Sequence, residues 1–282
     1  MSRNVYIRRR LAALAAIVAV LVAVAIVIGA LDGSSSRTDA TAHAARGVTR
    51  SGTHGTHHVV LASDRLVGCV ARGRSLVTTG PVTKREVALT FDDGPWDDPD
   101  SIRFVRLLAK LHVPATFFEI GSQIPEYDRD GSVEREMLAD GDMIGDHTWS
   151  HPDMTHLPVA QQTQELQWTI DAIRQRTGFT PCLWRPPYGA VNDGLVKLAR
   201  QMGMVTVMWD VDTRDWATPG VAQIVHVAVD DAHPGAIIIQ HFGGGPRTQT
   251  FAAIPHEVAL LRSKGYKFVT VAQMLGIKLR YA

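Results

Sequence analysis

The sequence is poor in cysteine and carries almost no excess charge of either sign. Cys69 and Cys182 are the only cysteines in 282 residues, too few for a disulfide-rich scaffold and without the spacing of a cysteine metal site. Lysine and arginine number 29 and aspartate and glutamate 28, so we expect no nucleic-acid partner, which would require a basic patch. No internal repeat is visible. With 45% hydrophobic residues, the composition fits an enzyme-sized globular chain.

Charge is also missing from one long segment near the N-terminus. Residues 11–31 form an uninterrupted apolar run that follows Arg8, Arg9 and Arg10. A helix of this length spans about 30 Å, the thickness of a bilayer, whereas a cleaved signal peptide has an apolar core of about 7–15 residues. We therefore predict an uncleaved, single-pass signal anchor, with a cleaved and secreted form as the alternative. The flanking arginines predict a cytoplasmic tail at 1–10 and an extracytoplasmic remainder.

The segment after the apolar run has few residues that could form a core. Residues 32–58 are rich in Gly, Ser, Thr and His, which predicts a flexible linker. Residues 59–83 are expected to form a transitional segment that packs on the following domain. The catalytic domain is then predicted to occupy residues 84–282.

Short apolar runs alternate with amphipathic stretches throughout this domain. This order predicts a parallel α/β sheet, and seven strand candidates favour a barrel over an open doubly wound sheet. The expected strands are 87–91, 115–119, 143–146, 183–185, 205–209, 236–240 and 268–271. The expected helices are 101–111, 133–139, 158–177, 192–202, 222–231 and 254–264.

Polar clusters follow the ends of five of these strands. Functional sites of parallel α/β folds are built at this edge of the sheet, so the clusters are candidates for one site. His147 and His151 are four residues apart, and two imidazoles with one carboxylate are a typical ligand set of a catalytic zinc. The carboxylate is expected to come from Asp92 or Asp93. Adjacent strand residues point in opposite directions, so one could bind metal while the other acts as a base.

Taken together, these motifs resemble the polysaccharide deacetylases, the NodB-homology proteins of carbohydrate esterase family four. The resemblance covers residues 85–277 and implies a distorted (β/α) barrel with about seven parallel strands, here preceded by one transmembrane helix. The matching motifs are TFDDGP (90–95), HTWSHP (147–152), RPPYG (185–189), DTRDW (212–216) and IQH (239–241).

The resemblance also implies a role for each motif residue. Asp92 would be the general base, paired with Arg185, and His241 would be the general acid, paired with Asp215. A divalent metal ion would be bound by Asp93, His147 and His151. Zn²⁺ is the expected ion, and Co²⁺ or another divalent ion is the alternative. The backbone N–H of Tyr188 would stabilise the oxyanion, and Trp216 would form a wall of the sugar groove. The sequence departs from the family at Phe242, where relatives often carry an acidic residue.

The implied function is removal of acetyl groups from an N-acetylated cell-wall glycan by a monomeric enzyme outside the membrane. An O-deacetylase on acetylated polysaccharide and a non-catalytic glycan-binding scaffold are the alternatives. In an oxidising compartment Cys69 and Cys182 could form a disulfide, and two buried thiols are the other outcome.

Overall fold

The computed structural model describes residues 65–71, 75–96 and 98–282. The predicted cytoplasmic tail, anchor and linker lie outside these residues. Within the described part, no helix is long and apolar enough to cross a membrane.

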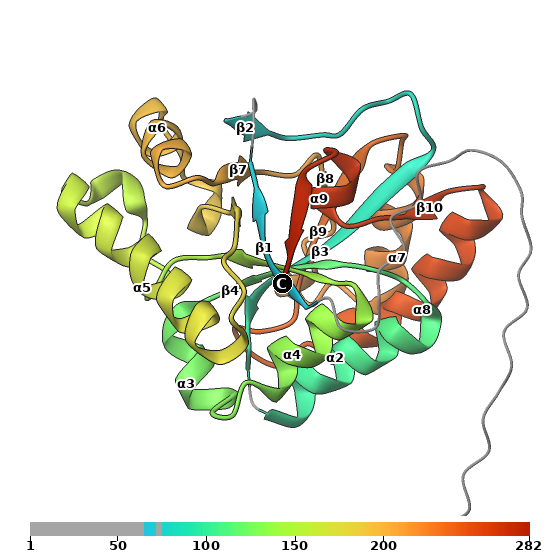
Figure 1. The fold of residues 1–282 in the computed structure, drawn as a ribbon. Helices are drawn as coiled ribbons and strands as arrows, with labels where there is room; N and C mark the ends of the chain where they lie inside the picture. The colour runs from blue at the N-terminus through green and yellow to red at the C-terminus, as the bar shows by residue number, and fades with distance from the viewer. Residues whose placement is uncertain (1–64, 72–74, 97) are drawn as a thin grey trace, which may run out of the picture. The chain divides into compact units, whose positions relative to one another are not determined.

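A parallel sheet forms the centre of the fold (Figure 1), and its described part contains nine strands. Eight of them follow one path, and the ninth, β10 (Lys267–Phe268), pairs with the start of β3. In spatial order the eight are β2 (Leu76–Val77), β7 (Val205–Val207), β6 (Leu183–Trp184), β5 (Met143–Asp146), β4 (Thr116–Glu119), β3 (Glu86–Gly94), β9 (Ala236–His241) and β8 (Val211–Asp212).

The sheet curls as a barrel does but does not close among the described strands. Its path ends at β2 on one side and β8 on the other. The chain leaves β7 at Met208, and β8 then pairs with β9 rather than with β7. The fold is therefore a curled parallel half-barrel, less complete than the barrel expected from the strand count.

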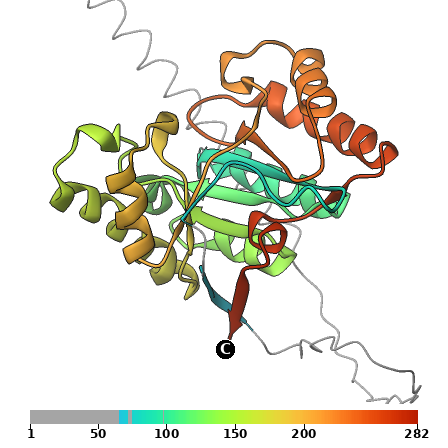
Figure 2. The same cartoon turned by 90° about the horizontal axis from the view of Figure 1, so that it is seen from above.

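Helices surround this sheet (Figures 1 and 2). The α-helices are α2 (Asp98–Leu111), α3 (Ile124–Tyr127), α4 (Ser132–Asp140), α5 (Val159–Thr177), α6 (Asp193–Gln201), α7 (Val221–Asp230), α8 (Thr248–Ser263) and α9 (Val271–Met274). Four single-turn 3₁₀ helices join the described elements, namely η1 (Gly121–Gln123), η2 (Met154–His156), η3 (Pro187–Gly189) and η4 (Asp215–Ala217).

Two predicted elements differ from the structure. The last helix was expected to begin at residue 254, but α8 begins at Thr248 and carries Pro255 in its interior. The strand expected at 268–271 ends at Phe268 instead. Thr270 caps the next helix through reciprocal hydrogen bonds with Gln273, so Val271 starts α9.

The packing of β3 determines where the first polar motif lies. Val87, Ala88, Leu89 and Phe91 are all fully buried, as expected for a parallel strand covered on both faces. The ring of Phe91 stacks on Phe117 with centroids 5.4 Å apart. This packing fixes the position of the carboxyl end of β3, from which the first polar motif extends.

The segment before β3 is attached to the domain by a ribbon and a covalent bond. β1 (Leu66–Val70) pairs antiparallel with β11 (Lys278–Tyr281), and the two strands lie side by side in Figures 1 and 2. Cys69 and Cys182 form a disulfide, which joins β1 to the residue before β6. The transitional segment therefore packs on the domain through its described residues.

Candidate active site

The five polar motifs meet at the carboxyl edge of the sheet. They line an open groove of about 610 Å³, hereafter the active-site groove. Its lining includes Asp92, Asp93, His147, His151, Tyr188, Trp216, His241 and Arg247. Arg185 and Asp215 are buried directly behind this lining, with exposed fractions of 0% and 1%.

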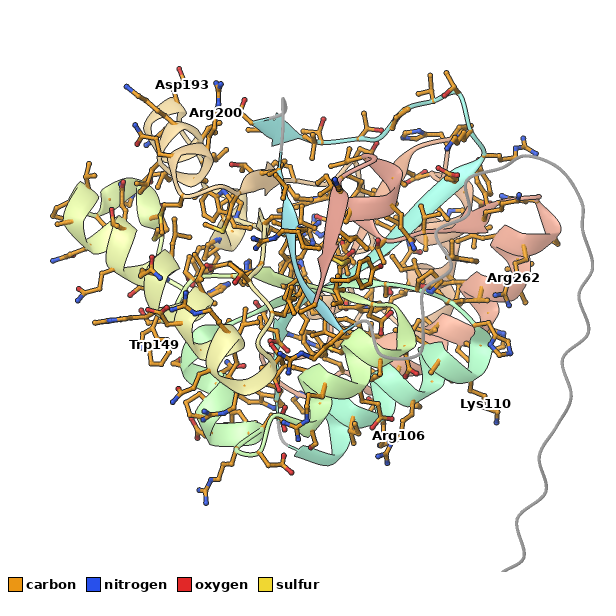
Figure 3. All side chains as sticks on the ribbon, viewed as in Figure 1. Arg106, Lys110, Trp149, Asp193, Arg200 and Arg262 are labelled. Atoms are coloured by element: carbon orange, nitrogen blue, oxygen red, sulfur yellow. A yellow bond between two sulfur atoms is a disulfide. The ribbon has the colours of Figure 1, made fainter. Side chains whose placement is uncertain are left out.

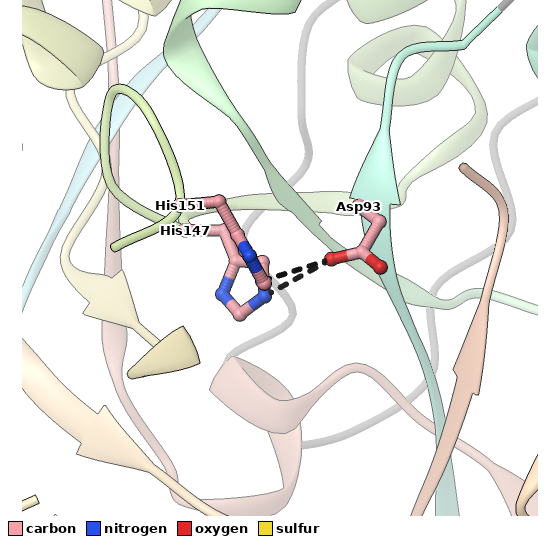
Figure 4. A group of neighbouring side chains, drawn as sticks. All are labelled: Asp93, His147 and His151. Carbon is pink, nitrogen blue, oxygen red and sulfur yellow. Dashed lines mark ion pairs between the residues drawn. The ribbon is translucent and has the colours of Figure 1, made fainter. Parts of the chain in front are cut away.

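Three ligand-type side chains converge at one end of the groove (Figure 4). Oδ1 of Asp93 lies 3.3 Å from Nε2 of His147 and 3.3 Å from Nε2 of His151. Within the described residues these are the three metal-ligating side chains whose donor atoms all lie within 4.8 Å of one another. One carboxylate and two imidazoles suit a catalytic divalent metal with positions left for water and substrate.

Both aspartates of the first motif face the same groove. Simple strand alternation would have placed them on opposite faces, and that expectation is wrong. A β-bulge interrupts the register between Asp92 and Gly94, and Asp93 has a left-handed backbone with φ of 72°. Oδ2 of Asp92 consequently lies 3.8 Å from Nε2 of His147. The two carboxylates can therefore act on the same reacting centre.

The hydrogen bonds around the triad fit a bound cation. Nδ1 of His147 lies 2.7 Å from the backbone carbonyl of Arg185, so this nitrogen carries the proton and Nε2 is left as a lone-pair donor. Oδ1 of Asp93 is buried and accepts no hydrogen bond. Burial alone would raise the pKa of Asp93, but the facing imidazoles and His241 hold it well below its usual range. The pKa of Asp93 is thus held low, as suits a carboxylate that binds a metal.

Arg185 holds the second aspartate in place. Its Nη1 donates to Oδ1 of Asp92 at 2.7 Å and to the hydroxyl of Thr90 at 2.8 Å. Nε and Nη2 donate to backbone carbonyls at the end of β7. Burial lowers the pKa of Arg185, and Asp92 partly restores it. An arginine remains charged in such surroundings, so Asp92 has a permanent cationic partner.

A second carboxylate–base pair lies across the groove. Nδ1 of His241 lies 2.8 Å from Oδ1 of Asp215, and the backbone N–H of His241 donates to Oδ2 at 2.8 Å. Burial lowers the pKa of His241, but the hydrogen bond and charge of Asp215 outweigh it and raise the pKa above 6.5. The raised pKa favours the protonated form of His241, which can donate a proton from Nε2.

Phe242 does not disturb this pair. Its side chain points into the core, where its ring lies 4.9 Å from that of Phe117 and only 1% of the residue is exposed. A Cβ at Gly94 would lie 2.1 Å from this ring, so the bulge after Asp93 requires glycine. Phe242 therefore has a structural role and supports the strand end that carries the aspartates.

The two predicted substrate-binding residues line the groove and are exposed. Tyr188 is 72% exposed and Trp216 is 50% exposed. The hydroxyl of Tyr188 lies 3.2 Å from Nδ1 of His151, and its backbone is left-handed with φ of 60°. The guanidinium of Arg214 lies 5.5 Å from the centre of the Trp216 ring. An exposed indole of this kind can stack on an apolar sugar face.

Two residues that support the site were not predicted from the sequence. The hydroxyl of Thr250, in the first turn of α8, donates to Oδ2 of Asp215 at 2.7 Å. Arg247 donates to the carbonyls of Gly243 and Gly244 and, at 3.5 Å, to that of Trp216. It thereby joins the loop after His241 to the Trp216 wall. The glycine run at 243–245 marked this loop, but no local pattern linked it to the DTRDW motif.

Comparison with known proteins agrees with this geometry. A profile of the family described as "Polysaccharide deacetylase" matches residues 79–207. A peptidoglycan-N-acetylglucosamine deacetylase of Bacillus cereus is 37% identical over 205 residues, which cover 70% of this chain and 92% of that protein. The peptidoglycan-N-acetylmuramic acid deacetylase PdaC of Bacillus subtilis is 36% identical over 195 residues, 69% of this chain but 40% of that protein.

The fold also matches solved structures of this kind. A crystal structure of a peptidoglycan N-acetylglucosamine deacetylase, in complex with an N-oxidanyl-benzamide compound, matches with a TM-score of 0.68 and 30% identity. The match covers 72% of this chain and 94% of that chain. The chain therefore belongs to the polysaccharide deacetylase family.

Proposed function

We propose that this protein is a metal-dependent N-deacetylase acting on cell-wall peptidoglycan. One observation carries the proposal: the metal-ligand triad, the Arg185-bound Asp92 and the Asp215-bound His241 all open onto one groove. A non-catalytic glycan-binding scaffold would not need all three. The similarity to deacetylases of both N-acetylglucosamine and N-acetylmuramic acid supports peptidoglycan without selecting between its two sugars.

Asp92 acts as the general base in this mechanism. A divalent metal held by Asp93, His147 and His151 would lower the pKa of water towards about 7 and polarise the acetyl oxygen. Asp92 takes the proton from the attacking water, and its ion pair with the buried guanidinium of Arg185 at 2.7 Å holds the carboxylate in position. Zn²⁺ is the proposed ion because two imidazoles and one carboxylate suit it, and Co²⁺ has similar ligand preferences.

His241 then acts as the general acid. It gives the proton on Nε2 to the amine nitrogen as the C–N bond breaks, while Asp215 stabilises the charged imidazole. The backbone N–H of Tyr188 would stabilise the oxyanion, and Trp216 would hold the sugar ring. An ester substrate, with a better leaving group, would depend less on His241.

We further propose that the domain lies outside the cell and is tethered to the membrane by residues 11–31. The disulfide between Cys69 and Cys182 supports an oxidising compartment, since cytosolic thiols are kept reduced. A tethered enzyme is positioned to act on the wall of its own cell rather than on a distant polymer. The proposed form is a monomer.

Acetate release from three substrates tests the proposed function. The full chain, supplied with Zn²⁺, is incubated with peptidoglycan, chitooligosaccharide and acetylated xylan. The proposal predicts the highest kcat/KM on peptidoglycan and loss of release after chelation. Faster release from acetylated xylan would instead identify an O-deacetylase, and no release from any of the three would contradict the proposal.

A further inference from the structure

A second cavity lies at the opposite end of the strands from the active-site groove. Its volume is about 780 Å³, and its lining includes Met143, the first residue of β5, whereas His147 follows the last residue of that strand. The end of α5 forms one wall, and the β1–β11 ribbon contributes Leu66, Leu279 and Tyr281 to another.

The charged side chains that line this cavity are all basic. Arg65, Arg135, Arg174 and Arg176 line it, and no acidic side chain of the described chain does. We call it the arginine cavity. The overall charge of the protein is close to neutral at +1, so this clustering is a local feature and does not follow from composition.

Two of the four arginines interact with a nearby acidic residue. Arg174 forms an ion pair with Asp171 at 2.7 Å. Arg135 donates to the backbone carbonyl of Asp130 at 2.6 Å, and the charge of Arg135 contributes to lowering the pKa of the exposed Asp130 carboxyl. These contacts place a carboxylate near each of the two guanidinium groups.

The other two arginines have no such partner. Neither Arg65 nor Arg176 forms an ion pair with any described residue, and Nε of Arg176 is buried without a hydrogen-bond acceptor. A buried, unpaired cationic donor is unfavourable because it has lost its water and gained nothing in exchange. An anion in the cavity would give the guanidinium of Arg176 the charged partner that it lacks.

Two of the cavity's guanidinium groups lie close to residues 176–178. Nη2 of Arg65 lies 3.0 Å from the position that a Cβ on Gly178 would occupy, two residues beyond Arg176. Nη1 of Arg135 reaches the same segment and donates to the carbonyl of Arg176 at 3.4 Å. The guanidinium groups of Arg65, just before β1, and of Arg135 in α4 therefore both lie beside the end of α5, which carries Arg176.

We propose that the arginine cavity binds a phosphate-bearing anion. A carboxylate presents two oxygens in one plane, whereas a phosphate can accept hydrogen bonds from several directions, as separate arginines require. A phosphomonoester carries a charge of about −1.5 to −2 at neutral pH, which matches two unneutralised arginines. The apolar side chains of Leu66, Leu138 and Tyr281 could contact an organic group attached to that phosphate.

Calorimetric titration of the full chain in a non-ionic detergent at low ionic strength tests this site. Inorganic phosphate and glycerophosphoglycerol serve as separate probes, so that a free phosphate and a phosphodiester of the lipid-headgroup type are distinguished. At least one probe should bind saturably with one site per chain. Arg65→Gln and Arg176→Gln should each weaken that binding at least tenfold.

The matched control is Arg200→Gln, an exposed arginine on α6 outside the cavity (Figure 3), which should bind as the wild type does. Arg65 is an exposed side chain, so its variant tests the site even where Arg176→Gln lowers stability. Deacetylation by Arg65→Gln should be unchanged, which separates this site from the proposed activity. Binding of neither probe, or binding that both arginine variants retain, would overturn the proposal.

Discussion

Two side chains that line the groove, those of Asp92 and His241, are each paired with a buried charged residue. Asp92 is held by Arg185, and His241 by Asp215. Each pair joins a side chain that lines the groove to one buried behind it. The motifs predicted these residues, but neither pairing could be worked out from spacing, because the partners lie 93 and 26 positions apart.

The Asp215 pair predicts a change in pH dependence. Asp215 raises the pKa of His241, and the acid must be protonated to act, so activity should fall only as pH rises through this raised pKa. In Asp215→Asn the pKa of His241 should fall, moving the alkaline limb of the kcat profile to lower pH. We also expect kcat to drop by about 10²-fold or more. Asp193→Asn, an exposed change on α6 (Figure 3), is the control, and an unmoved limb would count against the assigned acid.

At the scale of elements, long strands were predictable and short or irregular segments were not. All seven predicted strands exist at least in part because each is a run of buried apolar residues. β2 and β8, with two residues each, were not predicted, whereas the equally short β6 and β10 were found within longer apolar runs. The first turn of α8 depends on Thr250 bonding to Asp215 and on Phe251 packing against Phe104, and both contacts are distant in sequence. The bulge at Asp93 likewise depends on Gly94 meeting Phe242.

The contact between Gly94 and the ring of Phe242 makes Gly94→Ala a test of whether the bulge at the end of β3 requires glycine. The new Cβ would collide with the buried Phe242 ring, and overpacking of this kind typically costs about 1–3 kcal/mol. Denaturant unfolding should show this loss, and metal affinity should fall because Asp93 is displaced. Gly194→Ala, in the first turn of α6, has no comparable obstacle and should keep wild-type stability. Equal stability of both variants would show that the bulge tolerates a side chain.

The disulfide between β1 and the β6 region should contribute measurably to stability. It closes a loop with a sequence separation of 113, and native disulfides typically contribute about 2–4 kcal/mol. The double variant Cys69→Ser, Cys182→Ser should unfold at lower denaturant concentration by that amount. Reducing agent should destabilise the wild type to the level of the variant and leave the variant unchanged. An unaltered midpoint in both experiments would contradict a stabilising bond.

For the whole molecule, buried carboxyl groups should make stability depend on pH. Burial raises the pKa of Glu257 to about 8 and of Asp142 to about 7. At a pH between the ordinary pKa of such a group in the unfolded chain and its raised pKa in the folded protein, the folded state binds more protons than the unfolded state. The free energy of unfolding should therefore fall as pH rises from about 5 to 8. Each group contributes a slope on the order of 1 kcal/mol per pH unit.

Unfolding free energies of Glu257→Gln across this range test that expectation. The variant keeps a hydrogen-bonding group beside Gln240, and its stability should decline less steeply with pH than that of the wild type. The exposed change Glu126→Gln should leave the slope as it is. Parallel curves for wild type and Glu257→Gln would show that Glu257 does not titrate in this range.

The assignment of Asp92 as base and Asp93 as metal ligand is tested most directly by Asp92→Asn. Bound Zn²⁺ and acetate release from peptidoglycan are measured on the same preparation of the full chain. We predict one equivalent of metal, as in the wild type, with turnover reduced by about 10²- to 10⁴-fold through loss of the base. Full acetate release by this variant would contradict the mechanism, and loss of the metal would show that Asp92 is itself a ligand.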